Sequence, residues 1–151
     1  MRTIEELIAK PKPRQDWETP PEVFEHMNKR FNFTLDAAAN EINHKCEKYY
    51  TVEQDGLKLA WDKFTWLNPP YDKIGPWAYK AIDEAIRGNT TVMLVPSNRS
   101  DQQWWHDIMP YCEIEWIRGR VKFVGATGSP PFAVCYLIVR GMDTIEVIKY
   151  L

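Results

Sequence analysis

The sequence is poor in glycine, above all in its first third. Seven glycines occur in 151 residues, and none lies between Met1 and Tyr50. The usual dinucleotide-binding fingerprint needs several glycines in the turn between a first strand and the helix that follows it. That fingerprint is therefore excluded from the part of the chain where such a turn would be expected.

Three other scarcities exclude further classes of protein. The formal net charge is −2, whereas a protein that binds nucleic acid over its whole surface is usually clearly basic, so only a local basic face is compatible with this chain. No apolar run approaches the length of a membrane span, and residues 1–10 lack the apolar core of a signal peptide. Cys46, Cys112 and Cys135 have neither C-x-x-C nor zinc-ligand spacing. We expect reduced thiols, a cytoplasmic location, no membrane and no metal.

Aromatic residues, in contrast, are abundant: seven Trp, seven Tyr and six Phe. Most can belong to the core, but a surplus of rings also suits a protein that stacks on nucleic-acid bases. The length fits one domain with a sizeable core, and no repeat or low-complexity region interrupts it. We expect a single domain over residues 1–151, in which residues 1–16 form an extended, partly basic arm.

The most informative stretch is Asn68-Pro69-Pro70-Tyr71, which follows the apolar run 64–67. Two prolines fix φ and supply no backbone N–H, and Asn68 is held in extended geometry because it precedes a proline. The stretch is therefore expected at the carboxyl end of a buried strand, where open α/β sheets bind ligands. A carboxamide, stiffened carbonyls and an aromatic ring there suit a planar group that bears an amine. A simple strand-ending turn is the alternative.

Strands and helices alternate along the rest of the chain. Thr19 with Glu22, and Ser100 with Gln103, have the spacing of helix capping boxes. Strands are expected over 33–36, 47–52, 64–67, 90–95, 113–117 and 133–139, helices over about 20–32, 75–88 and 100–109, and a short final element over 143–151. The nearly continuous apolarity of 90–95 predicts burial on both faces. This order predicts an α/β fold with a mostly parallel central sheet and helices on both faces.

Together these motifs resemble the phage-type DNA N6-adenine methyltransferase (Dam) family, which uses S-adenosyl-L-methionine. The motifs that carry the resemblance are Trp17-x-Thr19-Pro20, Leu35-Asp36-x-Ala38-Ala39, Asn43-x-x-Cys46, Asp55-x-Leu57-x-x-x-Trp61, Asn68-Pro69-Pro70-Tyr71, Pro96-x-x-Arg99, Trp105-His106 and Gly119-Arg120-x-Lys122-Phe123. Several ordered motifs at suitable spacings are far more specific than any one of them.

The resemblance implies a Rossmann-like class I methyltransferase fold with a seven-stranded sheet whose last strand pair is antiparallel. It implies S-adenosyl-L-methionine as cofactor and double-stranded DNA as partner. The cofactor-binding residues it implies are Trp17, Thr19, Pro20, Asp36, Ala37, Ala38, Asp55 and Asn68. Glu47 and Glu53 are both candidates for the acid that holds the ribose. The alanines after Asp36 replace the glycines of other cofactor-binding turns, as they do in this family.

The resemblance also implies a catalytic role for Asn68, Pro69, Pro70 and Tyr71. The Asn68 side-chain oxygen and the Pro69 carbonyl would accept the two N–H bonds of the adenine amine, so that the nitrogen lone pair can face the methyl group. Tyr71 would stack on the base. Positioning and electrostatics would supply most of the catalysis, and a base in a duplex would have to be flipped out to reach the site.

DNA contacts are expected from Arg99, Arg120 and Lys122. Arg118, Arg120 and Lys122 alternate along an expected strand or ribbon, which is also what the solvated face of an ordinary strand looks like. The chain has little room for a separate target-recognition domain. The loop 125–131 or a second subunit of a homodimer would then read the DNA sequence, within bacterial cytoplasm if the protein is encoded by a phage or prophage.

Three other functions fit the same motifs. Asn-Pro-Pro-Tyr also occurs in methyltransferases that act on RNA adenine, cytosine N4 or protein glutamine. A catalytically silent nucleic-acid-binding module, or a generic nucleotide-binding α/β domain, would share the fold without the reaction. The ability to bind S-adenosyl-L-methionine separates the silent alternatives from the enzyme.

Overall fold

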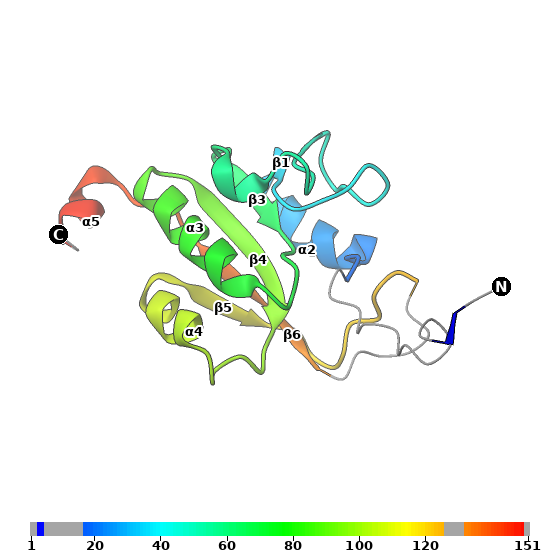
Figure 1. Cartoon of the computed structure of the whole chain (residues 1–151). Coiled ribbons are helices and arrows are strands. Elements are labelled where there is room, and N and C mark those ends of the chain that lie inside the picture. The colour runs from blue at the N-terminus through cyan, green and yellow to red at the C-terminus, as the bar shows by residue number, and fades with distance from the viewer. Residues whose placement is uncertain (1–2, 5–16, 126–131, 150–151) are drawn as a thin grey trace.

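The structure, a computed structural model, describes residues 3–4, 17–125 and 132–149 (Figure 1). Most of the expected arm over 1–16 and of the expected loop over 125–131 lies outside the described residues. The expected single domain and the absence of a separate target-recognition domain stay predictions.

A six-stranded sheet organises the described residues, with the strand order β2-β1-β3-β4-β6-β5. The strands are β1 (Leu35–Asp36), β2 (Lys48–Tyr49), β3 (Phe64–Leu67), β4 (Thr90–Pro96), β5 (Glu113–Trp116) and β6 (Val134–Val139). β1 pairs in parallel with β2 and β3, and β3 pairs in parallel with β4. β6 lies antiparallel between β4 and β5. The predicted α/β class with a mostly parallel sheet and an antiparallel last pair is confirmed, with six strands among the described residues where the resemblance implies seven.

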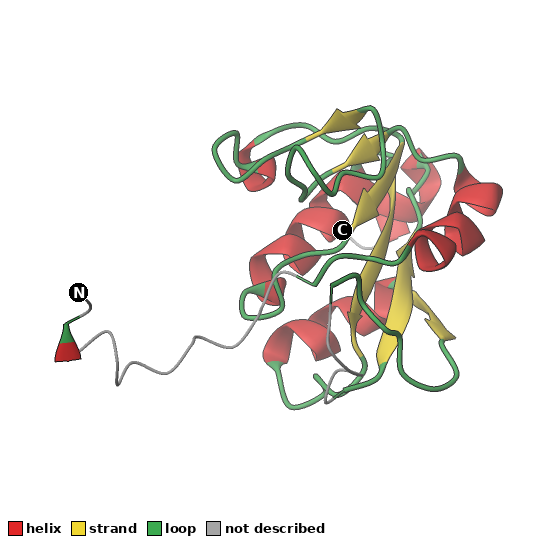
Figure 2. Cartoon of the chain, turned by 90° about the vertical axis from the view of Figure 1, so that its right-hand side faces the viewer, coloured by secondary structure: helices red, strands yellow, loops and turns green. Residues whose placement is uncertain are grey.

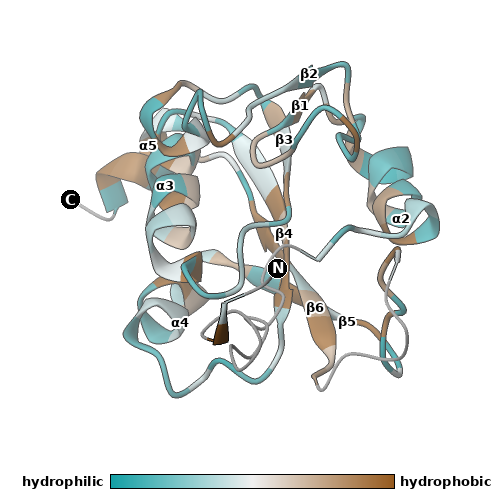
Figure 3. Ribbon diagram, turned by 45° about the vertical axis from the view of Figure 1, so that its right-hand side comes forward, coloured by the Kyte–Doolittle hydropathy of each residue, from teal (hydrophilic) through white to brown (hydrophobic). Residues whose placement is uncertain are grey.

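Helices cover both faces of the sheet (Figures 2 and 3). The helices are α2 (Pro21–Phe31), α3 (Ile74–Ile86), α4 (Gln103–Ile108) and α5 (Thr144–Lys149), with 3-10 turns η1 (Gly56–Lys58) and η2 (Met109–Tyr111). α2 lies on one side of the strands, and α3 and α4 lie on the other. Short parallel strands joined by such helices leave their carboxyl ends together at one edge of the sheet, where a crevice can form.

The core lies between the sheet and these helices. All seven residues of β4 and all six of β6 are buried, and Figure 3 shows both strands as largely hydrophobic. On the α2 side, the Phe24 ring packs 5.3 Å from the Trp66 ring and 5.8 Å from the Phe33 ring. Complete burial of one large apolar side chain contributes about 1.5–3 kcal/mol. This packed core therefore fixes the positions of the strand ends at that edge of the sheet.

Neither expected capping box forms. The cap of α2 is Pro20, whose carbonyl accepts from the Val23 amide at 3.1 Å, and no side chain caps this helix. Thr19 thus lies one residue outside the cap position, and its hydroxyl accepts a hydrogen bond from the Asn68 side chain instead. A turn in which the Gln102 amide donates to the Arg99 carbonyl delays the start of α4 to Gln103, which leaves Ser100 outside that helix.

The expected strand or ribbon over 118–123 is also wrong. The chain leaves the sheet after β5 and turns at Gly119, whose φ is +77°. Beyond the turn, Val121 and Phe123 are buried while Arg120 and Lys122 are exposed. Buried and exposed side chains do alternate, but in an extended segment that pairs with no strand of the sheet. The Val124 amide donates to the Glu18 carbonyl at 3.1 Å, and this hydrogen bond holds the segment beside residues 17–19.

No helix among the described residues is long and apolar enough to cross a membrane. Within the same residues, no three His, Cys, Asp or Glu side chains come together as a metal-binding group.

Candidate functional site

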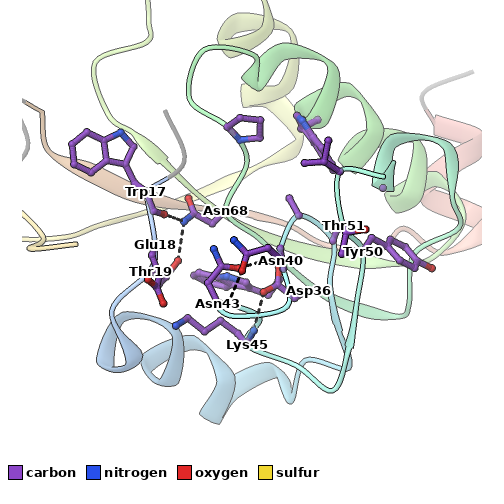
Figure 4. Close-up of a pocket in the computed structure, with 18 of the residues that line it drawn as sticks. Trp17, Glu18, Thr19, Asp36, Asn40, Asn43, Lys45, Tyr50, Thr51 and Asn68 are labelled. Carbon is purple, nitrogen blue, oxygen red and sulfur yellow. Dashed lines mark hydrogen bonds between the residues drawn. The ribbon is translucent and has the colours of Figure 1, made fainter. Parts of the chain in front are cut away.

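A cavity of about 510 Å³ opens at the carboxyl ends of β1 and β3 (Figure 4). Its size is within the range of small-molecule and cofactor sites. Four segments line it: residues 17–19 before α2, the turn after β1, the loop that leads into η1, and the residues after β3. The lining includes Trp17, Thr19, Asp36, Ala37, Ala38, Asp55 and Asn68, all of them predicted cofactor residues. Pro20, also predicted, does not line it, since it caps α2.

Asn68 ends β3 at the boundary of the cavity. Its side-chain nitrogen donates to the Thr19 hydroxyl at 2.9 Å and to the Trp17 main-chain carbonyl. Its side-chain oxygen is buried and has no hydrogen-bond partner among the described residues. A buried acceptor without a partner costs folding free energy, about 1–3 kcal/mol. Such an atom is a candidate for binding a donor that a ligand supplies.

Tyr71 does not line the cavity. Its side chain is 4% exposed, and its ring lies 6.3 Å from the Phe123 ring and 5.7 Å from the Phe132 ring. The Trp17 ring packs on the same two phenylalanines, at 5.3 and 5.6 Å. Trp17, Tyr71, Phe123 and Phe132 thus form an aromatic cluster beside Asn68. A base could stack on Tyr71 only if Phe123 or Phe132 made room for it.

Arg99 is half-buried, close to the Tyr71 ring of this cluster. Its Nε atom and the Tyr71 hydroxyl are both buried, and neither has a hydrogen-bond partner in the part of the chain that the structure describes. Burial raises the pKa of Tyr71 well above its usual value, the nearby Cys135 adds to this, and the positive charge of Arg99 opposes it. Tyr71 therefore stays a neutral phenol at physiological pH.

Asp36 ends β1 and is 3% exposed. One carboxylate oxygen accepts from the Lys45 amide at 2.9 Å, and the other has no partner among the described residues. Burial raises the pKa of this carboxyl from 3.8 to about 6, although the amides of Lys45 and Ala38 oppose the rise. An ionised Asp36 therefore offers an open acceptor and a negative charge to a cationic or N–H-bearing ligand.

The loop over 40–45 contributes residues that sequence reasoning missed as pocket residues. The Asn40 amide donates to the Asn43 side chain at 2.8 Å, which folds the loop back so that Lys45 reaches Asp36 (Figure 4). The other missed lining residues are Glu18, Ala39, Tyr50, Thr51, Val52, Gly56, Leu57, Trp66, Asp72, Lys73 and Trp77. The signal available was position: most of these residues lie within a predicted strand or follow one by a few residues.

Neither predicted ribose acid reaches the cavity. Glu47 and Glu53 are exposed and line a second, adjoining depression around β2 and the loop 39–54, which shares Ala39, Asn40 and residues 50–52 with the cavity. β2 is two residues long, so both acids lie beyond its ends. Asp55 does line the cavity, with one carboxylate oxygen accepting from the Leu57 amide at 3.1 Å.

The three predicted DNA-binding cations lie in two different settings. Arg99 is half-buried beside Tyr71, whereas Arg120 and Lys122 are exposed on the segment that carries Phe123. Phe123 packs on Trp17 and Tyr71, so the two exposed cations are on the segment that supplies one ring of the aromatic cluster, although neither lines the cavity.

Residues 8–132 match the family model described as DNA N-6-adenine-methyltransferase (Dam). A DNA N-6-adenine-methyltransferase of Escherichia phage T1 is 38% identical over 107 residues, which cover 69% of this chain and 45% of that protein. One of Haemophilus phage HP1 is 34% identical over 92 residues, 59% of this chain and 53% of that protein. A putative methyltransferase of Escherichia coli, YfdM, is 35% identical over 69 residues, 40% of this chain and 71% of that protein. The chain spans about half the length of the two phage relatives.

Proposed function

Because the chain belongs to the DNA N-6-adenine-methyltransferase (Dam) family, we propose that it transfers a methyl group from S-adenosyl-L-methionine to the N6 amine of adenine in double-stranded DNA. The observation that supports this most directly is the Asn68 carboxamide, whose oxygen is a buried acceptor without a partner at the boundary of a cavity of about 510 Å³. We expect the protein to act in the cytoplasm of a bacterial cell, as its phage relatives suggest.

The residues of the cavity fit this cofactor. When bound, S-adenosyl-L-methionine supplies a methyl group activated by a sulfonium. Asp36 presents an open carboxylate oxygen for its amino group, and Asp55 is the acid best placed for the ribose hydroxyls, since Glu47 and Glu53 lie outside the cavity. Gly56 packs so closely on the Ala37 carbonyl that it has no room for a Cβ, and both residues line the cavity. Trp17, Thr19 and Ala38 complete the predicted lining.

Asn68 and Pro69 would act on the acceptor base. The Asn68 oxygen and the Pro69 carbonyl would accept its two N–H bonds and so direct the nitrogen lone pair toward the methyl group. The carbon–sulfur bond would break as the nitrogen–carbon bond forms, and one proton of the amine would then be lost to water. Pro70 holds the backbone geometry, since neither proline can rotate about φ. Tyr71 provides a ring for stacking once the flipped base displaces Phe123 or Phe132. This chain's contribution is thus orientation and electrostatics, without a covalent intermediate.

The deciding experiment is methyl transfer from labelled S-adenosyl-L-methionine to unmethylated duplex DNA, followed by analysis of the digested nucleosides. N6-methyladenine is the expected product. N4-methylcytosine, or label found only in RNA or in protein glutamine, would contradict the proposed acceptor. Failure to bind the cofactor at all would contradict the enzyme and favour a silent binding module.

We predict that cofactor affinity falls in acid as Asp36 takes up a proton. With its pKa raised to about 6, Asp36 loses its negative charge below that pH, and affinity should fall about fivefold between pH 6 and pH 5 as the ionised fraction falls. Lys45 and His44 are the neighbouring groups whose charges oppose protonation. Isothermal titration of the cofactor against pH measures the effect, and Asp36→Asn should bind weakly at every pH, without this dependence.

The protonation of Asp36 can also be followed without a ligand, through the free energy of unfolding as a function of pH. The raised pKa means that the folded chain holds this proton more tightly than the unfolded chain, so the stability that Asp36 contributes is complete below about pH 4 and is lost as the pH rises toward about 6. Asp36→Asn should therefore be more stable than the wild type at pH 7 and equal to it near pH 4. A difference in unfolding free energy that does not vary with pH would show that Asp36 is not the titrating group.

We predict that Arg120→Ala with Lys122→Ala weakens DNA binding mainly through phosphate contacts. Both side chains are exposed on the segment whose Phe123 ring contacts the Tyr71 ring. Loss of two phosphate contacts should lower the slope of log affinity against log salt by about 2, with similar effects on all DNA sequences. Fluorescence anisotropy at several salt concentrations measures this slope.

The charge-matched control is Arg87→Ala with Lys149→Ala. Arg87 caps the carboxyl end of α3 and Lys149 ends α5, and Figure 1 shows both helices ending away from the carboxyl ends of β1 and β3. This variant removes the same charge and should keep the wild-type slope. An equal decrease of the slope in the two variants would mean that net charge, rather than Arg120 and Lys122 in particular, determines DNA binding.

A further inference from the structure

The direction in which the Asn68 carboxamide faces decides whether it can act. Its oxygen and nitrogen differ little in size, so the two orientations related by a half-turn fill the same space, and only hydrogen bonds distinguish them. One of these bonds is decisive. The partner is the main-chain carbonyl of Trp17, which can only accept, so the Asn68 atom that faces it must be the nitrogen.

Thr19 holds the second N–H of the same amide. Its hydroxyl oxygen lies 2.9 Å from the Asn68 nitrogen, the two residues are 49 positions apart, and the Thr19 side chain is 3% exposed. Since Thr19 does not cap α2, its position outside the helix leaves the hydroxyl directed at Asn68. With both N–H bonds occupied, the Asn68 oxygen is the atom left for a ligand.

The segment that carries these two partners is itself fixed at both ends. The Glu18 carbonyl accepts from the Val124 amide at 3.1 Å, and the Pro20 carbonyl accepts from the first turn of α2. The Trp17 ring is held between Phe123 and Phe132. A hydrogen-bond partner mounted on so constrained a segment orients a functional group before any ligand arrives, which is what preorganisation requires.

We propose that Thr19 is a positioning residue: together with the Trp17 carbonyl it locks the Asn68 carboxamide with its oxygen free for the acceptor amine, and the site therefore requires an amide rather than a carboxylate at position 68. This inference rests on the proposed function and deepens it. An ionised aspartate at position 68 would set a negative oxygen against the Trp17 carbonyl. A protonated one could donate a hydrogen bond to that carbonyl, as the amide does.

The first test separates positioning from cofactor contact by comparing Thr19→Val with Thr19→Ser. Valine keeps the shape of threonine without the acceptor, and serine keeps the acceptor. Thr19→Val should lower kcat for methylation of duplex DNA about tenfold, the effect of one lost neutral hydrogen bond on an oriented group, and this loss should exceed any change in cofactor Kd that follows from the place of Thr19 in the cavity lining. Thr19→Ser should restore most of kcat. Weakened cofactor binding at unchanged kcat, or a serine variant as slow as the valine variant, would overturn the proposal.

The second test uses the pH profile of Asn68→Asp. Its turnover relative to the wild type, at saturating cofactor, should rise about tenfold for each pH unit below neutrality until the new carboxyl is protonated. The titratable groups around position 68 are Glu18, Asp36, Tyr71, Asp72, Lys73 and Arg99. All of them are present in both proteins, so their own titration cancels in the ratio. A ratio that does not change with pH would overturn the requirement for an amide.

A third readout needs no turnover. In the ¹⁵N–¹H spectrum of the full chain, the two side-chain N–H signals of Asn68 should exchange slowly with water, and Thr19→Val should speed the exchange of one of them. Unchanged exchange in that variant would overturn the lock. If the wild type transfers no methyl group, the proposed function fails. If the wild type is active and these changes are absent, the role of Thr19 alone is refuted.

Discussion

Asn68→Ala is expected to reduce methyl transfer about a hundredfold to a thousandfold. Removing one preorganised hydrogen-bonding group from a reacting centre typically has an effect of about that size. Alanine removes the buried oxygen that is free for the acceptor amine, and it also leaves the Trp17 carbonyl and Thr19 hydroxyl without their shared donor. Single-turnover kinetics on duplex DNA measures the loss, which should appear in the chemical step more than in cofactor affinity.

Asn98→Ala is the matched control for this prediction. Asn98 is an exposed asparagine in the loop after β4 and does not line the cavity. Its removal should leave turnover close to that of the wild type. Thermal unfolding of both variants shows whether Asn68→Ala remains folded at the assay temperature. A folded Asn68→Ala variant with wild-type turnover would refute the assignment of Asn68 to the reaction.

Gly56→Ala is expected to destabilise the protein by about 3 kcal/mol, the upper part of the range for overpacked sites. A Cβ at this position would lie 2.3 Å from the Ala37 carbonyl oxygen and 3.2 Å from the Trp77 ring. The first of these neighbours is backbone at the end of β1, so η1 and the strand would have to move apart. Gly56 and Ala37 both line the cavity, and cofactor binding should weaken along with stability.

Gly75→Ala provides a control with the opposite sign. A Cβ there would lie 3.5 Å from the Trp104 ring, an ordinary contact, and the position is inside α3. Alanine is favoured over glycine in a helix by about 0.5–1 kcal/mol, so this variant should be slightly more stable than the wild type. Denaturant unfolding of the two variants measures both changes. Equal stability of Gly56→Ala and the wild type would mean that the contact between η1 and β1 yields without strain.

The aromatic cluster beside Asn68 bears on how the acceptor base would enter. Tyr71 is 4% exposed and lies between Phe123 and Phe132. A flipped base that stacks on Tyr71 would therefore have to replace the edge-on contact of one of these phenylalanine rings. Arg120 and Lys122 are on the same segment as Phe123. The sequence predicts that Tyr71 stacks on the base, but it does not predict that Phe123 and Phe132 pack on the Tyr71 ring.

Local sequence was sufficient for the elements and for the position of the site. Phe64–Leu67 had to end at Asn68 because the two prolines that follow cannot extend a strand, and the uninterrupted apolar run in β4 had to be buried on both faces. The helix expected over 75–88 likewise coincides with α3 (Ile74–Ile86). These features depend on neighbours along the chain, through φ restriction and side-chain periodicity, so they can be read in order from the residues.

Tertiary structure alone decided which partners the polar groups found. Thr19 has the spacing of a helix cap, yet its hydroxyl binds Asn68, and Glu47 and Glu53, both plausible by position, lie outside the cavity. Asp36 could be placed at a strand end from the sequence, but its burial, its open oxygen and its raised pKa depend on the loop that folds over it. A hydrogen bond between segments far apart in the chain leaves no local pattern, because it forms only when packing brings those segments together.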